Sequence, residues 1–137
     1  MNIDWIAIAA AAAASWIFGA LWYGVFARRW TAAAGLPGGR ADQGADKRAT
    51  IIALIVSLTA EFVMALILAG VIAHTAKKGV TIASGVLVGA ICWLGFVITT
   101  LATNYAYLKT RLSLVLIDGG HWLCALAIQG AVLGALL

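Results

Sequence analysis

Residues 112–137, LSLVLIDGGHWLCALAIQGAVLGALL, decide the fold, because this apolar run is long enough to cross a bilayer and still carries polar side chains. A charged side chain near the middle of a membrane costs roughly 2.5 to 3.5 kcal/mol on insertion scales, so an acid there is usually paired, protonated or functional. On a helix that turns about 100° per residue, four residues fall within about 60° of Asp118: His121, Trp122, Ala125 and Gln129. The polar groups of this segment therefore share one helix face.

The opposite side of the same segment is a strip of small residues: Gly120, Ala127, Gly130, Ala131 and Gly134. Glycines spaced four apart let two helix backbones approach closely within a membrane. The same spacing joins Ser15 to Gly19 and Gly85 to Gly89. The predicted helix-packing positions are therefore Gly19, Gly85, Gly89, Gly130 and Gly134.

The composition excludes a soluble globular protein, because 64% of the 137 residues are hydrophobic and only 10% are charged. The net charge is +4, and the basic residues lie in short segments between the apolar runs. Since the sequence has no nucleic-acid-binding motif, anionic lipid headgroups are the expected partner. Cys92 and Cys124 lie inside apolar runs and are interpreted as small core residues.

The pattern predicts an all-α fold, a single domain of residues 1–137 that forms an integral membrane bundle of four transmembrane helices. The predicted spans are about 5–27, 50–73, 80–103 and 112–136. The first span is expected to remain in the mature protein, since its apolar run stops at Arg28 and Arg29. Trp22, Tyr23 and Trp30 are predicted to lie at the membrane interface, where aromatic side chains are favoured.

The basic residues predict the orientation of the helices. Seven of them lie in the first and third loops: Arg28, Arg29, Arg40, Lys47, Arg48, Lys109 and Arg111. Only Lys77 and Lys78 lie in the second loop. The positive-inside rule then places the first loop, 28–49, in the cytoplasm and both termini on the periplasmic or exterior side of a bacterial inner membrane.

Polar side chains within the spans form a candidate polar pathway or interhelical network: Glu61, Asp118, His121, Thr99, Thr100 and Asn104. With the second and fourth helices running in the same direction, Glu61 and His121 differ in depth by only roughly 3 to 4 Å, so the two side chains are hypothesised to pair. Asp118 is expected at the level of Thr99 and Trp22. The network either handles protons or ions, or bonds internally and fixes helix packing.

No metal site, cofactor or enzymatic activity is expected. No helix offers the ligand spacing of a zinc site, and the sequence contains no nucleophile elbow, phosphate-binding glycine loop or metalloprotease motif.

Four short aromatic motifs resemble a bacterial membrane protein family called domain of unknown function 1761. They are Phe18-Gly19-x-x-Trp22-Tyr23, Trp30 with Gly35, Trp93-Leu94-Gly95-Phe96 and Ile117-Asp118-Gly119-Gly120-His121. The resemblance covers nearly the whole chain and implies a membrane protein of four helices, with an aromatic residue more usual than histidine at position 121. It implies no activity.

The expected function is that of a helix-packing, accessory or assembly component of a bacterial membrane. The chain is expected to contact the lipid bilayer and to form a homo-oligomer or join a larger membrane complex, because its glycine-rich faces need to be covered. The alternative is a small proton- or ion-coupled transporter or channel that uses Glu61, Asp118 and His121. The first reading treats the buried acids as packing groups, and the second treats them as the lining of a path.

Overall fold

The structure, a computed structural model, describes residues 4–35, 47–75 and 79–137. It contains five α-helices and one π-helical segment in these ranges: α1 (Trp5–Ala34), α3 (Lys47–Thr75), α4 (Ile82–Cys92), η1 (Trp93–Val97), α5 (Ile98–Tyr107) and α6 (Leu112–Leu136). The segments α4, η1 and α5 form one continuous helix, so four helices are long and apolar enough to cross a membrane. The predicted all-α fold with four membrane-spanning helices is confirmed.

Helix α1 ends where the backbone adopts a non-helical conformation, and this point lies beyond the end of the apolar run. Helix α1 continues past Arg28 and Arg29 and ends at Gly35, which adopts a left-handed conformation with φ of 68°. A charged side chain can leave the membrane while its backbone stays helical, whereas glycine at φ above zero ends a helix at little steric cost. The helix that contains the first predicted span, 5–27, thus continues for seven more residues and ends at Ala34.

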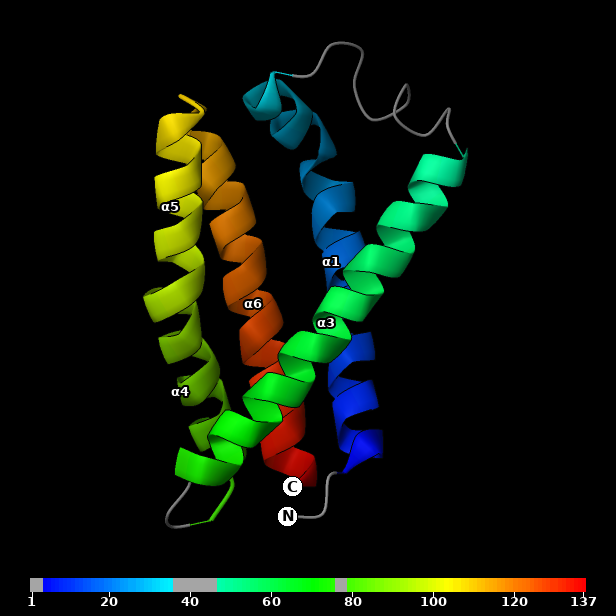
Figure 1. The fold of residues 1–137 in the computed structure, drawn as a ribbon, viewed down its shortest axis with the longest axis vertical. Helices are drawn as coiled ribbons and strands as arrows, with labels where there is room; N and C mark the ends of the chain where they lie inside the picture. Colours follow the sequence, from blue (N-terminus) through cyan, green and yellow to red (C-terminus); the bar gives the residue numbers. More distant parts are fainter. Residues whose placement is uncertain (1–3, 36–46, 76–78) are drawn as a thin grey trace.

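The connection at 36–46 and the turn at 76–78 lie outside the described residues, and with them Arg40, Lys77 and Lys78 of the orientation argument. Arg28, Arg29, Lys47 and Arg48 lie near that first connection, at the same end of the bundle as the turn between α5 and α6 (Figure 1). The start of α1 and the end of α6 lie together at the opposite end. The described basic residues of the first and third loops therefore share one end of the molecule.

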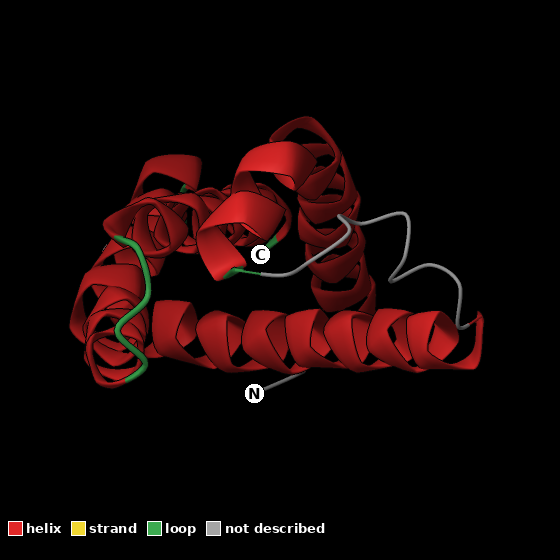
Figure 2. Cartoon of the chain, turned by 90° about the horizontal axis from the view of Figure 1, so that it is seen from above, coloured by secondary structure: helices red, strands yellow, loops and turns green. Residues whose placement is uncertain are grey.

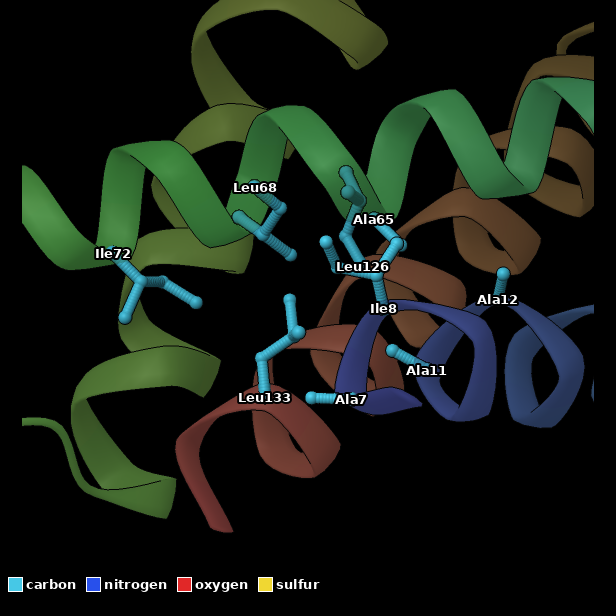
Figure 3. Packing of buried hydrophobic residues seen from close by; sticks show 9 residues of the cluster. All are labelled: Ala7, Ile8, Ala11, Ala12, Ala65, Leu68, Ile72, Leu126 and Leu133. Atoms are coloured by element: carbon cyan, nitrogen blue, oxygen red, sulfur yellow. The ribbon is translucent and has the colours of Figure 1, made fainter. Parts of the chain in front are cut away.

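The helices are packed closely at the end that holds the chain termini and diverge at the other end (Figure 1). Helix α3 is strongly tilted across the remaining helices, and the view from above shows it along one edge of the molecule (Figure 2). The apolar core lies where α1, α3 and α6 meet (Figure 3). Its buried members are Ala7, Ile8, Ala11, Ala12, Ala65, Leu68, Ile72, Leu126 and Leu133. Every residue from 47 to 60, in contrast, is exposed.

Glycines join α4 to α6 with almost no space between the backbones. A Cβ added at Gly85 would collide with the carbonyl oxygen of Gly130, and a Cβ at Gly130 would collide with that of Gly85. Gly89 faces Leu126 in the same way, and Gly134 faces Thr81. Residue numbers in these pairs increase along α4 while they decrease along α6, so the two helices are antiparallel.

The structure confirms these glycines as packing positions and corrects what was concluded from them. The small face of α6 was expected to need a partner protein, but α4 of the same chain covers it. A glycine-rich face of a membrane helix can pack against any neighbouring helix, whether from the same chain or from another. Here the neighbour is α4, the helical segment of the same chain that faces these glycines. The α6 glycines therefore give no argument for a homo-oligomer.

We expect Gly130→Ala to lower the free energy of unfolding in detergent by roughly 1 to 3 kcal/mol, because the new methyl group forces the α4 and α6 backbones apart. The matched control is Gly24→Ala, since a Cβ at Gly24 meets nothing within 4 Å. This control should leave stability unchanged or raise it by up to about 1 kcal/mol through helix propensity. Equal effects of the two substitutions would contradict the close α4–α6 contact.

Candidate functional site

Asp118 is a buried acid whose two carboxylate oxygens accept hydrogen bonds from aromatic side chains of two other helices. Oδ1 accepts from the Tyr23 hydroxyl at 2.8 Å and from Trp30 Nε1 at 3.0 Å, both on α1. Oδ2 accepts from the Tyr105 hydroxyl on α5 at 2.7 Å. We call these four residues the Asp118 cluster. It joins α1, α5 and α6 at one point and leaves the acid 5% exposed.

Two tryptophans donate to the α6 backbone beside Asp118. Trp22 Nε1 lies 3.1 Å from the carbonyl oxygen of Ile117, and Trp93 Nε1 lies 2.8 Å from that of Gly119. A Cβ at Gly120 would lie 3.2 Å from the Trp22 ring, so the absence of a side chain there lets the indole approach. Trp22, Tyr23 and Trp30 thus direct their polar atoms to α6. Their position at the membrane interface stays a prediction.

The π-helical segment η1 decides which side chains of the third membrane helix face Asp118. A π turn accommodates one extra residue, which rotates everything after it by about 100° relative to a regular α-helix. With this shift Tyr105 lies only about 20° from Trp93 around the helix axis, whereas a regular helix would place it about 120° away. The bulge therefore brings both aromatic donors to the α6 side.

The same rotation removes the predicted threonines from the network. In a regular helix Thr100 and Asn104 would share the face of Trp93, but the structure leaves Thr99, Thr100 and Asn104 exposed. The Thr99 hydroxyl donates to the carbonyl oxygen of Gly95 and the Thr100 hydroxyl to that of Phe96, both within their own helix. Their predicted place beside Asp118 is wrong, and Tyr105 occupies it.

Glu61 forms a second buried cluster with Ser15 of α1 and Gln129 of α6. Its Oε2 accepts from the Ser15 hydroxyl and from Gln129 Nε2, each over 2.7 Å. Gln129 Nε2 also lies 2.9 Å from the Ser15 hydroxyl oxygen and 3.1 Å from the backbone oxygen of Glu61. We call these three residues the Glu61 cluster. All three are almost fully buried, and they join α1, α3 and α6 next to the apolar core.

His121 lies between these clusters and bonds to neither of them. Its ring is 4% exposed and is surrounded by the rings of Phe18, Tyr23 and Trp122, with centroid separations of 6.2, 4.8 and 4.7 Å. Neither ring nitrogen has a hydrogen-bond partner among the described residues. Gly19 makes room for the imidazole, because a Cβ there would lie 2.8 Å from His121 Nε2.

The hypothesis that Glu61 pairs with His121 is therefore wrong. It compared depths along parallel helices, but α3 is strongly tilted (Figure 1), so the carboxylate of Glu61 meets α6 at Gln129, two turns beyond His121. The shared face predicted for α6 is nevertheless correct, since Asp118, His121 and Gln129 are all buried. No group of three metal-ligating side chains occurs in the described parts of the chain.

A family model described as protein of unknown function (DUF1761) matches residues 6–134, which is nearly the whole chain. The chain belongs to the DUF1761 family. No similar protein was found among curated proteins or among solved structures. The family assignment agrees with the resemblance and carries no activity.

The motif residues that resemble DUF1761 come together around Asp118. Trp22 and Tyr23 come from the first motif, Trp30 from the second and Trp93 from the third, and all four donate hydrogen bonds to residues 117–119. Residue patterns alone did not reveal these donors, although the sequence held a usable signal. An acid in an apolar span needs donors, and tyrosine and tryptophan are among the few apolar side chains that supply them.

We expect Tyr105→Phe to lower the free energy of unfolding by roughly 1 to 2 kcal/mol, since it removes a donor from a buried carboxylate. Tyr107→Phe is the control on the same helix, because Tyr107 is 86% exposed. Thermal unfolding of both variants in one detergent measures the difference. A Tyr105→Phe variant as stable as Tyr107→Phe would show that the bulge does not bring Tyr105 to Asp118.

The Glu61 cluster predicts a specific pattern of coupling. In a double-mutant cycle with Glu61→Ala and Gln129→Ala, the two effects on unfolding should be coupled by roughly 1 kcal/mol, because the two side chains share a buried hydrogen bond. In the matched cycle with His121→Ala the coupling to Glu61 should stay within about 0.5 kcal/mol. Stronger coupling to His121 than to Gln129 would restore the original pairing and contradict the structure.

Proposed function

We propose that the chain is a non-catalytic assembly component of a membrane, whose buried acids hold its own helices together. Two features support this proposal. Both carboxylate oxygens of Asp118 already accept hydrogen bonds from other helices, which is typical of an acid that holds helices together. The first half of α3 is exposed along its full circumference, so its surface is available to another membrane helix.

The observation that carries the assembly role is the change in packing along α3. Residues 47–60 are exposed on every face, whereas Glu61, Ala65, Leu68 and Ile72 of the second half are buried against the bundle. The exposed half includes Ile52, Ile55 and Val56, which offer bulky apolar contacts. Helices associate in membranes through side-chain packing, so we assign this surface to a second copy of the chain.

The proposed location is the bacterial inner membrane, with both termini on the periplasmic or exterior side. The described basic residues at the end of α1, at the start of α3 and between α5 and α6 support this orientation, since they gather at the end opposite the termini. Copies that share one orientation would bring their α3 helices together around an axis perpendicular to the membrane. Such an arrangement gives a symmetric homo-oligomer.

The test is disulfide cross-linking in native membranes. After Cys92 and Cys124 are replaced by alanine, a cysteine at Ile55 should form a cross-linked dimer, because the α3 surfaces meet there. A cysteine at Leu116, which is 65% exposed on α6, is the matched control and should cross-link several-fold less. Equal cross-linking at both positions, or a monomeric mass of the purified protein in nanodiscs, would overturn the assembly role.

Small-molecule or ion transport is the second candidate, and one observation favours it. Glu61 and His121 line a common cleft between α1, α3 and α6, although they do not bond to each other. Asp118 is not part of this candidate path, because the Asp118 cluster encloses it. Proton flux into liposomes under a pH gradient, lost in Glu61→Gln and retained in Thr99→Val, would favour transport over assembly.

A further inference from the structure

A cleft of about 250 Å³ lies between α1, α3 and α6. Its walls include the rings of Trp16, Tyr23 and Trp122, the small side chain of Ala20, and the two titratable groups Glu61 and His121. We call it the α1–α3 cleft. Leu54 and Ser57 of the exposed half of α3 also line it, so the cleft borders the assembly surface proposed above.

The unpartnered imidazole of His121 is the evidence for a ligand in this cleft. A neutral imidazole has one N–H donor and one acceptor nitrogen, and a buried polar group without a partner normally costs several kcal/mol in a membrane interior. Both His121 nitrogens lack a partner, although the side chain is 4% exposed and borders the cleft. Nε2 lies beside Gly19, which also lines the cleft, since a Cβ built at Gly19 would be 2.8 Å from this nitrogen.

The charge of the lining selects a cation. Glu61 reaches the cleft with one carboxylate oxygen, Oε2, already bonded within the Glu61 cluster. Among the residues that the structure describes, no lysine or arginine lines the cleft. An ionised acid that is buried without a basic neighbour is stabilised by a positively charged ligand, which supplies the missing counter-charge.

The aromatic walls select an organic cation over a metal ion. Tryptophan and tyrosine rings attract ammonium groups through their π faces, and aromatic cages recognise alkylated ammonium ions in this way. Trp16 is held in place by its Nε1, which donates to the Ser57 hydroxyl at 2.9 Å. We propose that the α1–α3 cleft binds a small organic ammonium ion, with Glu61 as its counter-ion and His121 as its hydrogen-bond acceptor.

The size of the cleft limits the ligand. Sites for drug-sized molecules occupy about 300 to 1,000 Å³, and this cleft lies just below that range. A ligand with one ring or a short branched chain fits, and its apolar part lies against Ala20 and Trp122. The ligand class is therefore a protonated amine with a small apolar body.

The probe is N,N-dimethylbenzylamine, which is protonated at neutral pH, and its matched control is isobutylbenzene, in which carbon replaces the nitrogen. The protein is labelled with ¹⁵N-histidine in nanodiscs, where it shows two imidazoles, His74 and His121. We expect the amine to shift the His121 signals with saturation and to leave those of exposed His74 in place. Isobutylbenzene should bind about tenfold more weakly or not at all, because it lacks the charge.

Two variants separate binding from stability. Glu61→Gln should weaken amine binding by about tenfold and abolish the preference over isobutylbenzene, since the counter-ion is lost. Because that change also alters the Glu61 cluster, Ala20→Leu provides an independent test that fills the cleft without touching a polar group. Ala13→Leu, at an exposed position of α1 outside the cleft, is its control and should bind normally.

The proposal is overturned by equal His121 shifts with the amine and isobutylbenzene, which would indicate an apolar site filled by lipid. It is also overturned if Ala20→Leu binds the amine as tightly as Ala13→Leu. Both results are read from amine binding and not from cross-linking, so failure of the ligand site can be told apart from failure of the assembly role.

Discussion

The carboxylate of Asp118 is the constraint on which the arrangement of the bundle depends. An acid buried among apolar helices is tolerated only when its lone pairs receive hydrogen bonds, and water is scarce in that environment. Here Tyr23 and Trp30 fix the rotation of α1 about its axis, and Tyr105 fixes that of α5. Hydrogen bonds are directional, whereas contacts between apolar side chains allow several relative positions of two helices. The Asp118 cluster therefore fixes the position of α1 and α5 along α6.

Regular helical geometry was enough to predict α6 and not enough to predict the helix before it. The face shared by Asp118, His121 and Gln129 follows from 100° steps because α6 is unbroken. In the third membrane helix the π turn at Trp93–Val97 inserts one residue, so regular steps from Trp93 lead to Thr100 and Asn104 and miss Tyr105. The pairing of Glu61 failed for a different reason, since a sequence contains no direct signal for helix tilt.

The two ends of the bundle are held together by different means. Near the chain termini, apolar side chains and glycine contacts join the helices without polar groups. Toward the other end, the Glu61 cluster and the Asp118 cluster join the helices. The part of α3 that precedes Glu61 is exposed. The glycine spacing correctly predicted close backbone contacts and incorrectly predicted that another protein makes them. Spacing identifies a face that must be covered, and only the fold identifies the helix that covers it.

The family motifs are accounted for by the fold, and this narrows the search for function. The tryptophans and tyrosine of these motifs donate to residues 117–119, so their polar atoms are fully used in holding α1 and the third membrane helix against α6. A residue whose hydrogen bonds are all needed by the fold explains the architecture and says nothing about a ligand. His121 differs from them, because its nitrogens bond to nothing within the described chain and its ring borders a cleft. His121 is therefore the family-motif residue whose polar atoms the fold does not use, and the α1–α3 cleft is where a ligand could reach it.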